Sequence, residues 1–358
     1  MLIYFGLITI WLLLYLLLNK KIRYNKKKKL LYAFIAGGFL FLVMGLRSPV
    51  VGADTNQYLY RYNYIIYNMN MEIFKNSEWG FELFNSLFRG LGFNNQGYIL
   101  VTSFIISLSI SLFFYKYSKN IFISFFLHLT IGMFTMSMSG IRQTLAICFI
   151  LLAFNYMMKK KFVKFLISVL LAYTFHNSAI VFLPIYLLRN IRVNKKNGII
   201  LLLMTTSMLV LRKLVVPIME KFSPQKYIDR YGLTSDVHYV NPLLIVIAIA
   251  IPATCLFFWS RTEELEKNER ELFYMLFILS CVNVLVNILS LNSNMIGRLS
   301  FYFITFNVVL IPNIISLIKN KKLRTIAIFL CLVLPLIQFV ISTPGGTLHI
   351  DQYRFFWQ

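Results

Sequence analysis

The sequence is poor in charge, and especially poor in acidic side chains. Only 14% of the 358 residues are charged, and 13 Asp and Glu stand against 36 Lys and Arg. In a soluble protein, the net charge of +23 would suggest a nucleic-acid partner. Here the positive residues form short clusters between long apolar runs, as they do in the loops of membrane proteins. The composition therefore predicts an integral membrane protein that binds no nucleic acid.

Residues that hold metals or nucleotides are also scarce. The four cysteines all lie within apolar runs and have neither disulfide nor metal spacing. The sequence contains no His-x-x-x-His pair, no Asp-x-Asp and no Gly-rich phosphate loop. We therefore expect no metal and no cofactor, and no nucleotide-bound donor on the cytoplasmic side.

Several apolar runs reach or approach the ~20 residues that a membrane helix needs. The first, Met1 to Leu18, has no cationic n-region and no cleavage site, so it is predicted to be a retained span. The basic cluster at 19–29 marks the cytoplasmic side, which places residues 47–95 in an extracytoplasmic loop. Within that loop, Glu78 to Leu91 has apolar residues at helical spacing and is predicted to be an amphipathic helix at the membrane interface.

The apolar run at 165–188 is long enough for one membrane crossing and too short for two. One crossing would place the basic cluster around Arg192 outside, whereas two crossings need about 40 residues. We therefore predict a re-entrant hairpin of two half-helices, with His176 near its tip. Residues 217–240 then form a second extracytoplasmic loop. Residues 1–358 as a whole are predicted to be one all-α, polytopic transmembrane domain of about ten helices plus the hairpin.

A polar stretch, RSPVVGADTNQY, begins at Arg47 directly after an apolar run. Pro49 and Gly52 break any continuing helix, and Asp54 and Thr55 are good N-caps for the aromatic segment that follows. Both a capped surface helix and a functional site fit this stretch.

Isolated arginines stand at several predicted membrane boundaries. Any one of them could simply extend to the interface, but as a set they favour the binding of an anion, because guanidinium groups are planar, permanently charged donors suited to phosphate. Interspersed aromatic rings offer flat faces for sugars, although membrane proteins in general have an aromatic belt. Among the few acid-base candidates, His176 is unusual because it lies within an apolar run, where it is either a titrating group or a hydrogen-bonded core residue.

Six motifs, in this order, resemble those of the EpsG/Wzy-type polysaccharide polymerases of bacteria. They are RSPVVGADTNQY at 47–58, EWGFELFN at 78–85, SGIRQTLA at 139–146, AYTFHNSAIV at 172–181, GRLSFYF at 297–303 and YRFF at 353–356. The similarity covers nearly the whole chain, although the segment 217–240 matches none of the family's motifs. The resemblance implies a GT-C-like, O-antigen-polymerase-like membrane fold.

The resemblance also implies an activity. A growing glycan would be transferred from undecaprenyl diphosphate to a hydroxyl of the next lipid-linked repeat unit, at the outer face of the bacterial cytoplasmic membrane. The product would be a capsule, an exopolysaccharide or an O-antigen. A flippase and a chain-length regulator are possible partner proteins of such an enzyme.

Site residues follow from the same resemblance. The catalytic candidates are Asp54 and His176 as alternative bases, and Glu78, which would orient sugar hydroxyls or share the acid-base work. The residues expected to bind the diphosphate are Arg47, Arg142, Arg298 and Arg354. Those expected to bind sugar are Tyr58, Gln143, Tyr302 and Tyr353.

Two other classes of protein stay open. A flippase or exporter of lipid-linked oligosaccharides would also need many spans, but we would expect an internal repeat, and the sequence has none. A ligase-like glycosyltransferase or an acyltransferase would share the outer Arg and His residues and differ in its acceptor.

Overall fold

The computed structural model describes residues 1–18, 25–64, 78–191, 193–221, 242–292, 294–346 and 350–358. Within these ranges the regular elements are helices, and the one strand-like pairing is an isolated bridge between Arg47 and Phe355. Seven of the described helices are long and apolar enough to cross a membrane, or eight if one bent pair is a single span. The prediction of an all-α, multi-pass membrane protein is thus confirmed.

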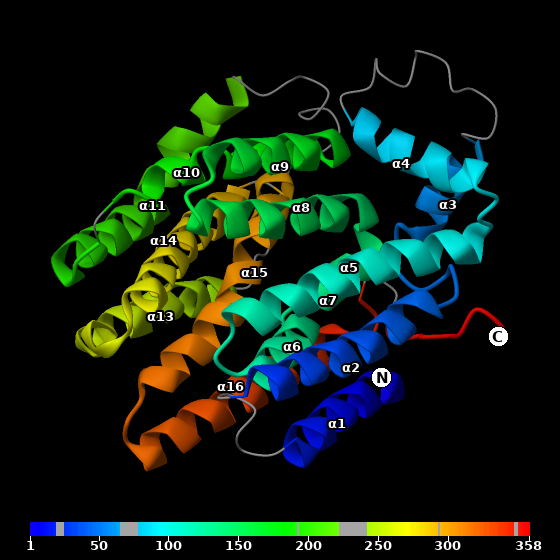
Figure 1. Cartoon of the computed structure of the whole chain (residues 1–358). Helices are drawn as coiled ribbons and strands as arrows, with labels where there is room; N and C mark the ends of the chain where they lie inside the picture. Colours follow the sequence, from blue (N-terminus) through cyan, green and yellow to red (C-terminus); the bar gives the residue numbers. More distant parts are fainter. Residues whose placement is uncertain (19–24, 65–77, 192, 222–241, 293, 347–349) are drawn as a thin grey trace. The chain divides into compact units, whose positions relative to one another are not determined.

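The helices divide into two compact units. Unit 1 comprises residues 1–183 and 325–358, and unit 2 comprises residues 184–324. Unit 1 contains α1 (Leu2–Leu17), α2 (Lys26–Gly45), α3 (Thr55–Tyr64), α4 (Trp79–Gly90), α5 (Asn95–Tyr117), α6 (Ile121–Thr130), α7 (Met133–Ser139), α8 (Ile141–Met158), α9 (Phe162–Phe175), the 3-10 helix η3 (Asn177–Phe182) and most of α16 (Lys321–Ser342) (Figure 1). The single domain predicted from the sequence stays a prediction.

Unit 2 is built around one long apolar helix, α14. It contains α10 (Ile185–Leu188), α11 (Lys195–Lys221), α13 (Pro242–Phe257), η4 (Trp259–Glu264), α14 (Lys267–Leu289), η5 (Ser290–Asn292) and α15 (Asn294–Leu317). Helices α11, α13 and α15 all pack against α14. Ile245 and Ala248 of α13 meet Val284 and Ile288 of α14 in a buried apolar cluster.

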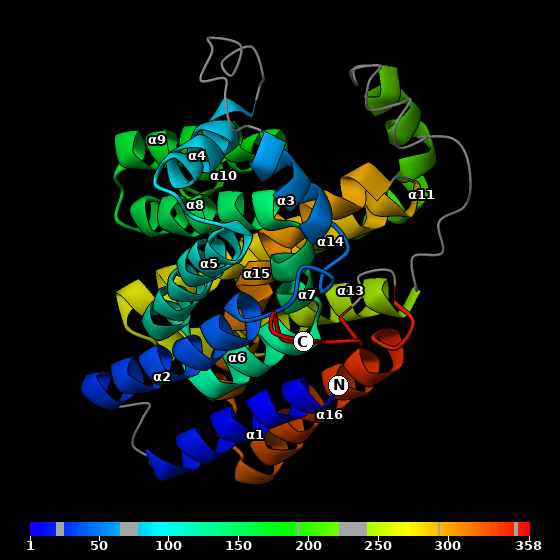
Figure 2. The ribbon, with the colours of Figure 1, turned by 90° about the vertical axis from the view of Figure 1, so that its right-hand side faces the viewer.

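In unit 1, the long helices pack in antiparallel pairs. Helix α2 lies along α5, α8 lies along α9, and α5 also contacts α8. The C-terminal ends of α2 and α9 therefore meet the N-terminal ends of α5 and α8, and the short helices α3 and α4 cover that end (Figure 1). Helix α16 returns to the same unit and lies beside α1 (Figure 2). The ring of Phe339 on α16 packs edge-on against that of Tyr4 on α1.

Some predicted spans differ from the observed helices. The apolar run at 121–137 does not form one continuous helix, because α6 and α7 are bent by 58° at a break around Gly132. Gly132 has φ +88°, a left-handed conformation that a glycine adopts without strain and that a helix cannot continue through. Helices α1 and α13 each have 16 residues, fewer than the ~20 of a full crossing.

The predicted hairpin corresponds to a reversal of the chain. Helix α9 ends at His176, whose backbone is extended, and η3 then packs back against α9. The ring of Phe182, at the end of η3, lies 6.2 Å from that of Phe165, near the start of α9. How this segment sits in a bilayer stays a prediction, and most of the loop predicted at 217–240 lies outside the described residues.

Helix α4 is amphipathic, but its polar face is buried and its apolar face is exposed, the reverse of a surface helix in a soluble protein. Its leucines Leu83 and Leu87 are exposed, whereas Glu82, Asn85 and Ser86 are buried against the rest of unit 1. An exposed apolar stripe on a short helix suits the membrane interface that was predicted for it. The buried polar face must be satisfied from within, and it forms part of the candidate active site.

Candidate active site

The centre of the site is the carboxylate of Glu78, which stands at the N-cap of α4. Its Oε1 atom accepts hydrogen bonds from Nδ1 of His176, at 2.8 Å, and from the backbone N–H of Asn177, at 3.2 Å. Its Oε2 atom forms an ion pair with Arg142. Three of the sequence motifs, far apart along the chain, therefore meet at one carboxylate.

Local structure positions each of these side chains. Arg142 lies in the first turn of α8, whose N-cap is Gly140, and His176 is the C-cap of α9, where the helix gives way to extended backbone. Helix α4 can approach α9 closely because residue 80 is glycine. A Cβ atom built on Gly80 would overlap the side chain of Thr174 and lie 2.7 Å from its Cβ. This contact holds Glu78 within hydrogen-bonding distance of His176.

The environment keeps Glu78 ionised. Burial by itself raises the pKa of its carboxyl group, but the hydrogen bond from His176 and the charge of Arg142 outweigh it and lower the pKa below the ordinary value of 4.5. The stability that these bonds contribute is present above about pH 4.5 and is lost only as the pH falls through the lowered pKa. At neutral pH, Glu78 is therefore an acceptor and cannot act as a proton donor.

This state of Glu78 fixes the proton on His176. Because an ionised carboxylate only accepts, the Nδ1 atom of His176 must carry the hydrogen of their bond. In the neutral imidazole, Nε2 is then the acceptor. A carboxylate that holds one ring nitrogen while the other takes a proton is the arrangement of many general bases.

The guanidinium group of Arg142 has N–H donors that its ion pair with Glu78 does not use. One guanidinium nitrogen pairs with Glu78, whereas its Nε atom is buried and has no hydrogen-bond partner among the described residues. The first N–H groups of α8, next to it, also favour an anion. The site can thus hold a negative group beside the free nitrogen of His176.

A second ion pair, between Arg61 of α3 and Glu82 of α4, was missed in the sequence. Burial lowers the pKa of Arg61, and the positive charge of Arg142 lowers it further, so the two arginines lie within electrostatic reach. Asn85, three residues after Glu82, is fully buried, and its amide has no partner among the described residues. The spacing of Glu78, Glu82 and Asn85 on one helix face was the signal that could have found them.

Other predicted site residues surround this cluster. Asp54 precedes α3, is half-buried, and has no side-chain partner among the described residues. The ring of Tyr58 packs edge-on against Phe81 at 5.8 Å. Gln143, next to Arg142 on α8, is buried. Within the described ranges, no three His, Cys, Asp or Glu side chains are grouped so as to hold a metal ion.

Arg47, predicted to bind the diphosphate, is fully buried and bonded to the protein itself. It donates to the backbone carbonyls of Met44, Val51 and Met138, and to the hydroxyl of Ser103. Burial lowers its pKa to about 10, which still leaves the guanidinium charged at neutral pH. These bonds tie the end of α2 to the following loop, to α5 and to α7, which favours a structural role.

The C-terminal tail is joined to the same loop. The amide of Ser48 donates to the carbonyl of Arg354, and the hydroxyl of Tyr353 donates to the carbonyl of Val43 at 2.8 Å. The side chain of Arg354 is exposed and lines an open hollow of about 340 Å³ together with Asn56. Tyr353 is thus bonded to the backbone, while Arg354 is accessible to a ligand.

Two further predicted residues belong to unit 2. Arg298 and Tyr302 lie four residues apart on α15, with Arg298 exposed and Tyr302 fully buried. That they share a substrate with Arg142 stays a prediction.

Gly80 offers a test of the geometry. We expect Gly80→Ala to slow the predicted glycan transfer by between about 10- and 100-fold. Displacing α4 by even 1 Å would misplace Glu78 relative to His176. The initial rate of the purified variant measures this effect. Gly90→Ala, on the same helix with open space around the new methyl group, is the matched control, and Thr174→Ala should restore part of the lost rate. A wild-type rate in Gly80→Ala would mean that the reaction does not depend on this contact.

Comparison with known proteins adds one finding. The model of the EpsG family matches residues 30–348, from the second turn of α2 to the start of the C-terminal tail. Neither a curated protein sequence nor a solved structure matches the chain.

Proposed function

The chain belongs to the EpsG family, and from this premise we propose that it is a membrane polysaccharide polymerase whose reaction centre is formed by Glu78, His176 and Arg142. Family membership supports a polymerase role in general. The finer proposal is that a growing glycan passes from undecaprenyl diphosphate to a hydroxyl of the next lipid-linked repeat unit, at the outer face of the bacterial cytoplasmic membrane. The observation that carries it is the carboxylate-held histidine beside a partly unpaired arginine.

In the proposed reaction, His176 is the general base. Its Nε2 atom takes the proton of the acceptor hydroxyl as that oxygen attacks the anomeric carbon of the donor sugar. The bond from that carbon to the diphosphate oxygen breaks, and the electron pair leaves with the diphosphate. Glu78 holds the imidazole in the required tautomer and stabilises the imidazolium that forms.

Arg142 would stabilise the leaving group. A buried N–H without a partner costs about 1–3 kcal/mol, and a diphosphate oxygen bonded to the Nε atom would remove this cost. Charge developing on the leaving oxygen would strengthen the bond in the transition state. Arg61 is near enough to contribute to the same positive potential. Its ion pair with Glu82 offsets its charge, so the net positive charge of the site stays small.

The direct test is polymerisation by the purified protein from a lipid-diphosphate-linked repeat unit, without nucleotide. We expect a ladder of products for the wild type and a rate at least about 100-fold lower for Arg142→Ala, since the leaving group loses its main counter-charge. Arg261→Ala, at an exposed ion pair in η4 of unit 2, is the matched control and should polymerise normally. Intact substrate that instead moves across a vesicle membrane would make the protein a transporter and refute the proposal.

A further inference from the structure

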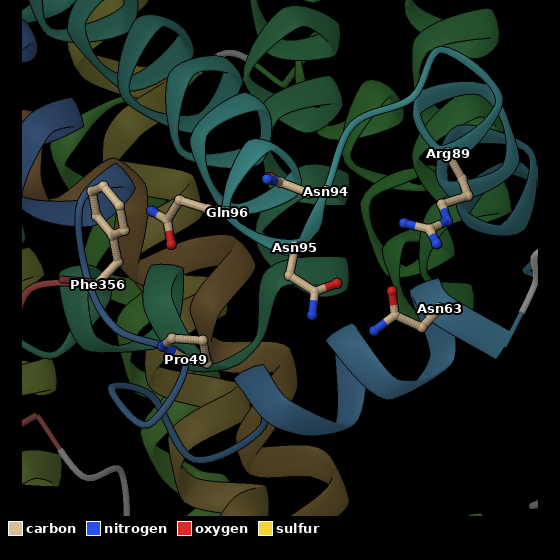
Figure 3. Close-up of a pocket in the computed structure, with 7 residues that line it drawn as sticks. All are labelled: Pro49, Asn63, Arg89, Asn94, Asn95, Gln96 and Phe356. Carbon is tan, nitrogen blue, oxygen red and sulfur yellow. The ribbon is translucent and has the colours of Figure 1, made fainter. Parts of the chain in front are cut away.

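A second polar hollow lies in unit 1, away from Glu78. It is open, has a volume of about 470 Å³, and is lined by the ends of α3 and α4, the start of α5 and the C-terminal tail. In Figure 3, the polar ends of Asn63, Arg89 and Asn95 converge on one side, and the ring of Phe356 stands on the other. The volume falls within the range of about 300–1,000 Å³ typical of ligand sites.

Its lining has an unusual chemical composition. Besides Pro49, the lining consists of one guanidinium, one aromatic ring and four carboxamides, from Asn63, Asn94, Asn95 and Gln96, and it includes no carboxylate. Each carboxamide offers both donors and an acceptor, as a sugar hydroxyl does. A phosphate site would concentrate cations, and a site for an apolar ligand would be lined mainly by hydrophobic groups. The composition therefore favours a neutral saccharide.

Two of these amides are already fixed by the protein. The side-chain oxygen of Asn94 accepts from the Gly97 amide at 2.8 Å and caps α5, and the amide nitrogen of Gln96 donates to the carbonyl of Gly45. The amide nitrogen of Asn94 and the amide oxygen of Gln96 remain available to a ligand. Asn63 and Asn95 are half-buried, and their side chains make no hydrogen bond to the described part of the chain. Asn94 and Gln96 are thus held in place, which lowers the cost of ordering them around a ligand, while Asn63 and Asn95 are available to bind it.

The remaining two side chains are held as well. The guanidinium of Arg89 lies over the ring of Tyr62 at 5.6 Å, donates to the carbonyl of Phe93 at 3.5 Å, and lines the hollow. Phe356 stays 46% exposed although it is aromatic, while its backbone amide is anchored to the carbonyl of Leu46 at 2.9 Å. An exposed, fixed ring can stack against the apolar face of a sugar.

The same two helices connect this hollow to the reaction centre. Glu78 begins α4 and Arg89 lies in its last turn, which separates them by about 16 Å along the helix axis. On α3, Arg61 pairs with α4 near the reaction centre, and Asn63 lines the hollow. A glycan of several sugars would span this distance.

From these observations we propose that the hollow is a second glycan-binding site, which holds sugars several units away from the one that reacts. The proposal rests on the proposed polymerase function and specifies its substrate: neutral sugars bound through carboxamides and the Phe356 ring. A chain retained here after one transfer would be extended again before it dissociates.

Binding can be measured without catalysis. The probe is a lipid-free oligosaccharide of two repeat units, released from the substrate by mild acid and titrated calorimetrically into the full-length protein. We expect binding by the wild type and about tenfold weaker binding by Asn63→Leu/Asn95→Leu, which loses two amide hydrogen-bond partners of the ligand. Phe356→Ala, outside the helices, should weaken binding comparably. Gln57→Leu, an exposed amide on α3 outside the hollow, is the matched control.

The outcomes separate this proposal from the polymerase assignment. With the lipid-linked substrate, the double variant should make shorter products while the first transfer keeps its wild-type rate. Oligosaccharide binding that is lost in the double variant but kept in Arg142→Ala would support the site even if no ladder formed. Equal binding by wild type and double variant would overturn it, as would displacement of the oligosaccharide by inorganic pyrophosphate, which would indicate an anion site at Arg89.

Discussion

His176→Ala is expected to lower the polymerisation rate by about 10²- to 10⁴-fold, the usual contribution of a general base. Its Nδ1 atom is held by an ionised Glu78, which leaves Nε2 as the only acceptor of the ring. The loss should fall on the catalytic rate, because Arg142, the proposed diphosphate ligand, is unchanged. Single-turnover kinetics with a fluorescent lipid-linked repeat unit measures the rate, and titration with the same lipid measures its binding.

Asp54→Asn is the decisive companion variant. Sequence alone leaves Asp54 and His176 as alternative bases, but the geometry gives a carboxylate partner only to the histidine. We therefore expect Asp54→Asn to keep a rate within a few-fold of the wild type. The reverse result, an active His176→Ala and an inactive Asp54→Asn, would transfer the role of base to Asp54 and leave Glu78 with a structural function.

Three residues that the motifs singled out, Glu78, Arg142 and His176, lie together in the structure because each stands at the end of a helix. That they form an active site stays a prediction. Arg142 opens α8, His176 closes α9 and Glu78 caps α4, so antiparallel packing of neighbouring helices gathers them at one end of unit 1. Helix ends follow from local signals such as the Ser139-Gly140 turn. Motifs that are far apart in the sequence could therefore be expected to lie close together in the structure.

Other features depend on contacts that no local pattern encodes. The pairing of Arg61 with Glu82 requires α3 to cross α4, and the polar hollow requires the C-terminal tail to return to the end of α2. The helical spacing at 78–91 corresponds to α4, on which Leu83 and Leu87 are exposed and Glu82 is buried. That α4 lies at the membrane interface stays a prediction. Hydrophobic periodicity alone does not say which face of a helix is buried, and the rule for soluble proteins would have placed the leucines inside.

Arg47→Met is expected to destabilise unit 1 by about 3 kcal/mol. Methionine fills similar space but donates no hydrogen bond, so the carbonyls of Met44, Val51 and Met138 lose a buried donor. Each orphaned group costs about 1–3 kcal/mol, although Thr55 still donates to two of the three. For a unit of this size we expect the melting temperature to fall by roughly 5–10 °C, measured by scanning fluorimetry in detergent.

Arg354→Met provides the control, because its exposed side chain belongs to the tail that pairs with the same loop through backbone groups. Its melting temperature should stay within about 1 °C of the wild type, since surface substitutions usually change stability by less than 0.5 kcal/mol. If Arg47→Met instead melted like the wild type and bound the fluorescent lipid diphosphate more weakly, Arg47 would be a substrate ligand, as its motif suggested. A buried guanidinium with four protein partners argues for the first result, because moving it to a ligand would break all four of these hydrogen bonds.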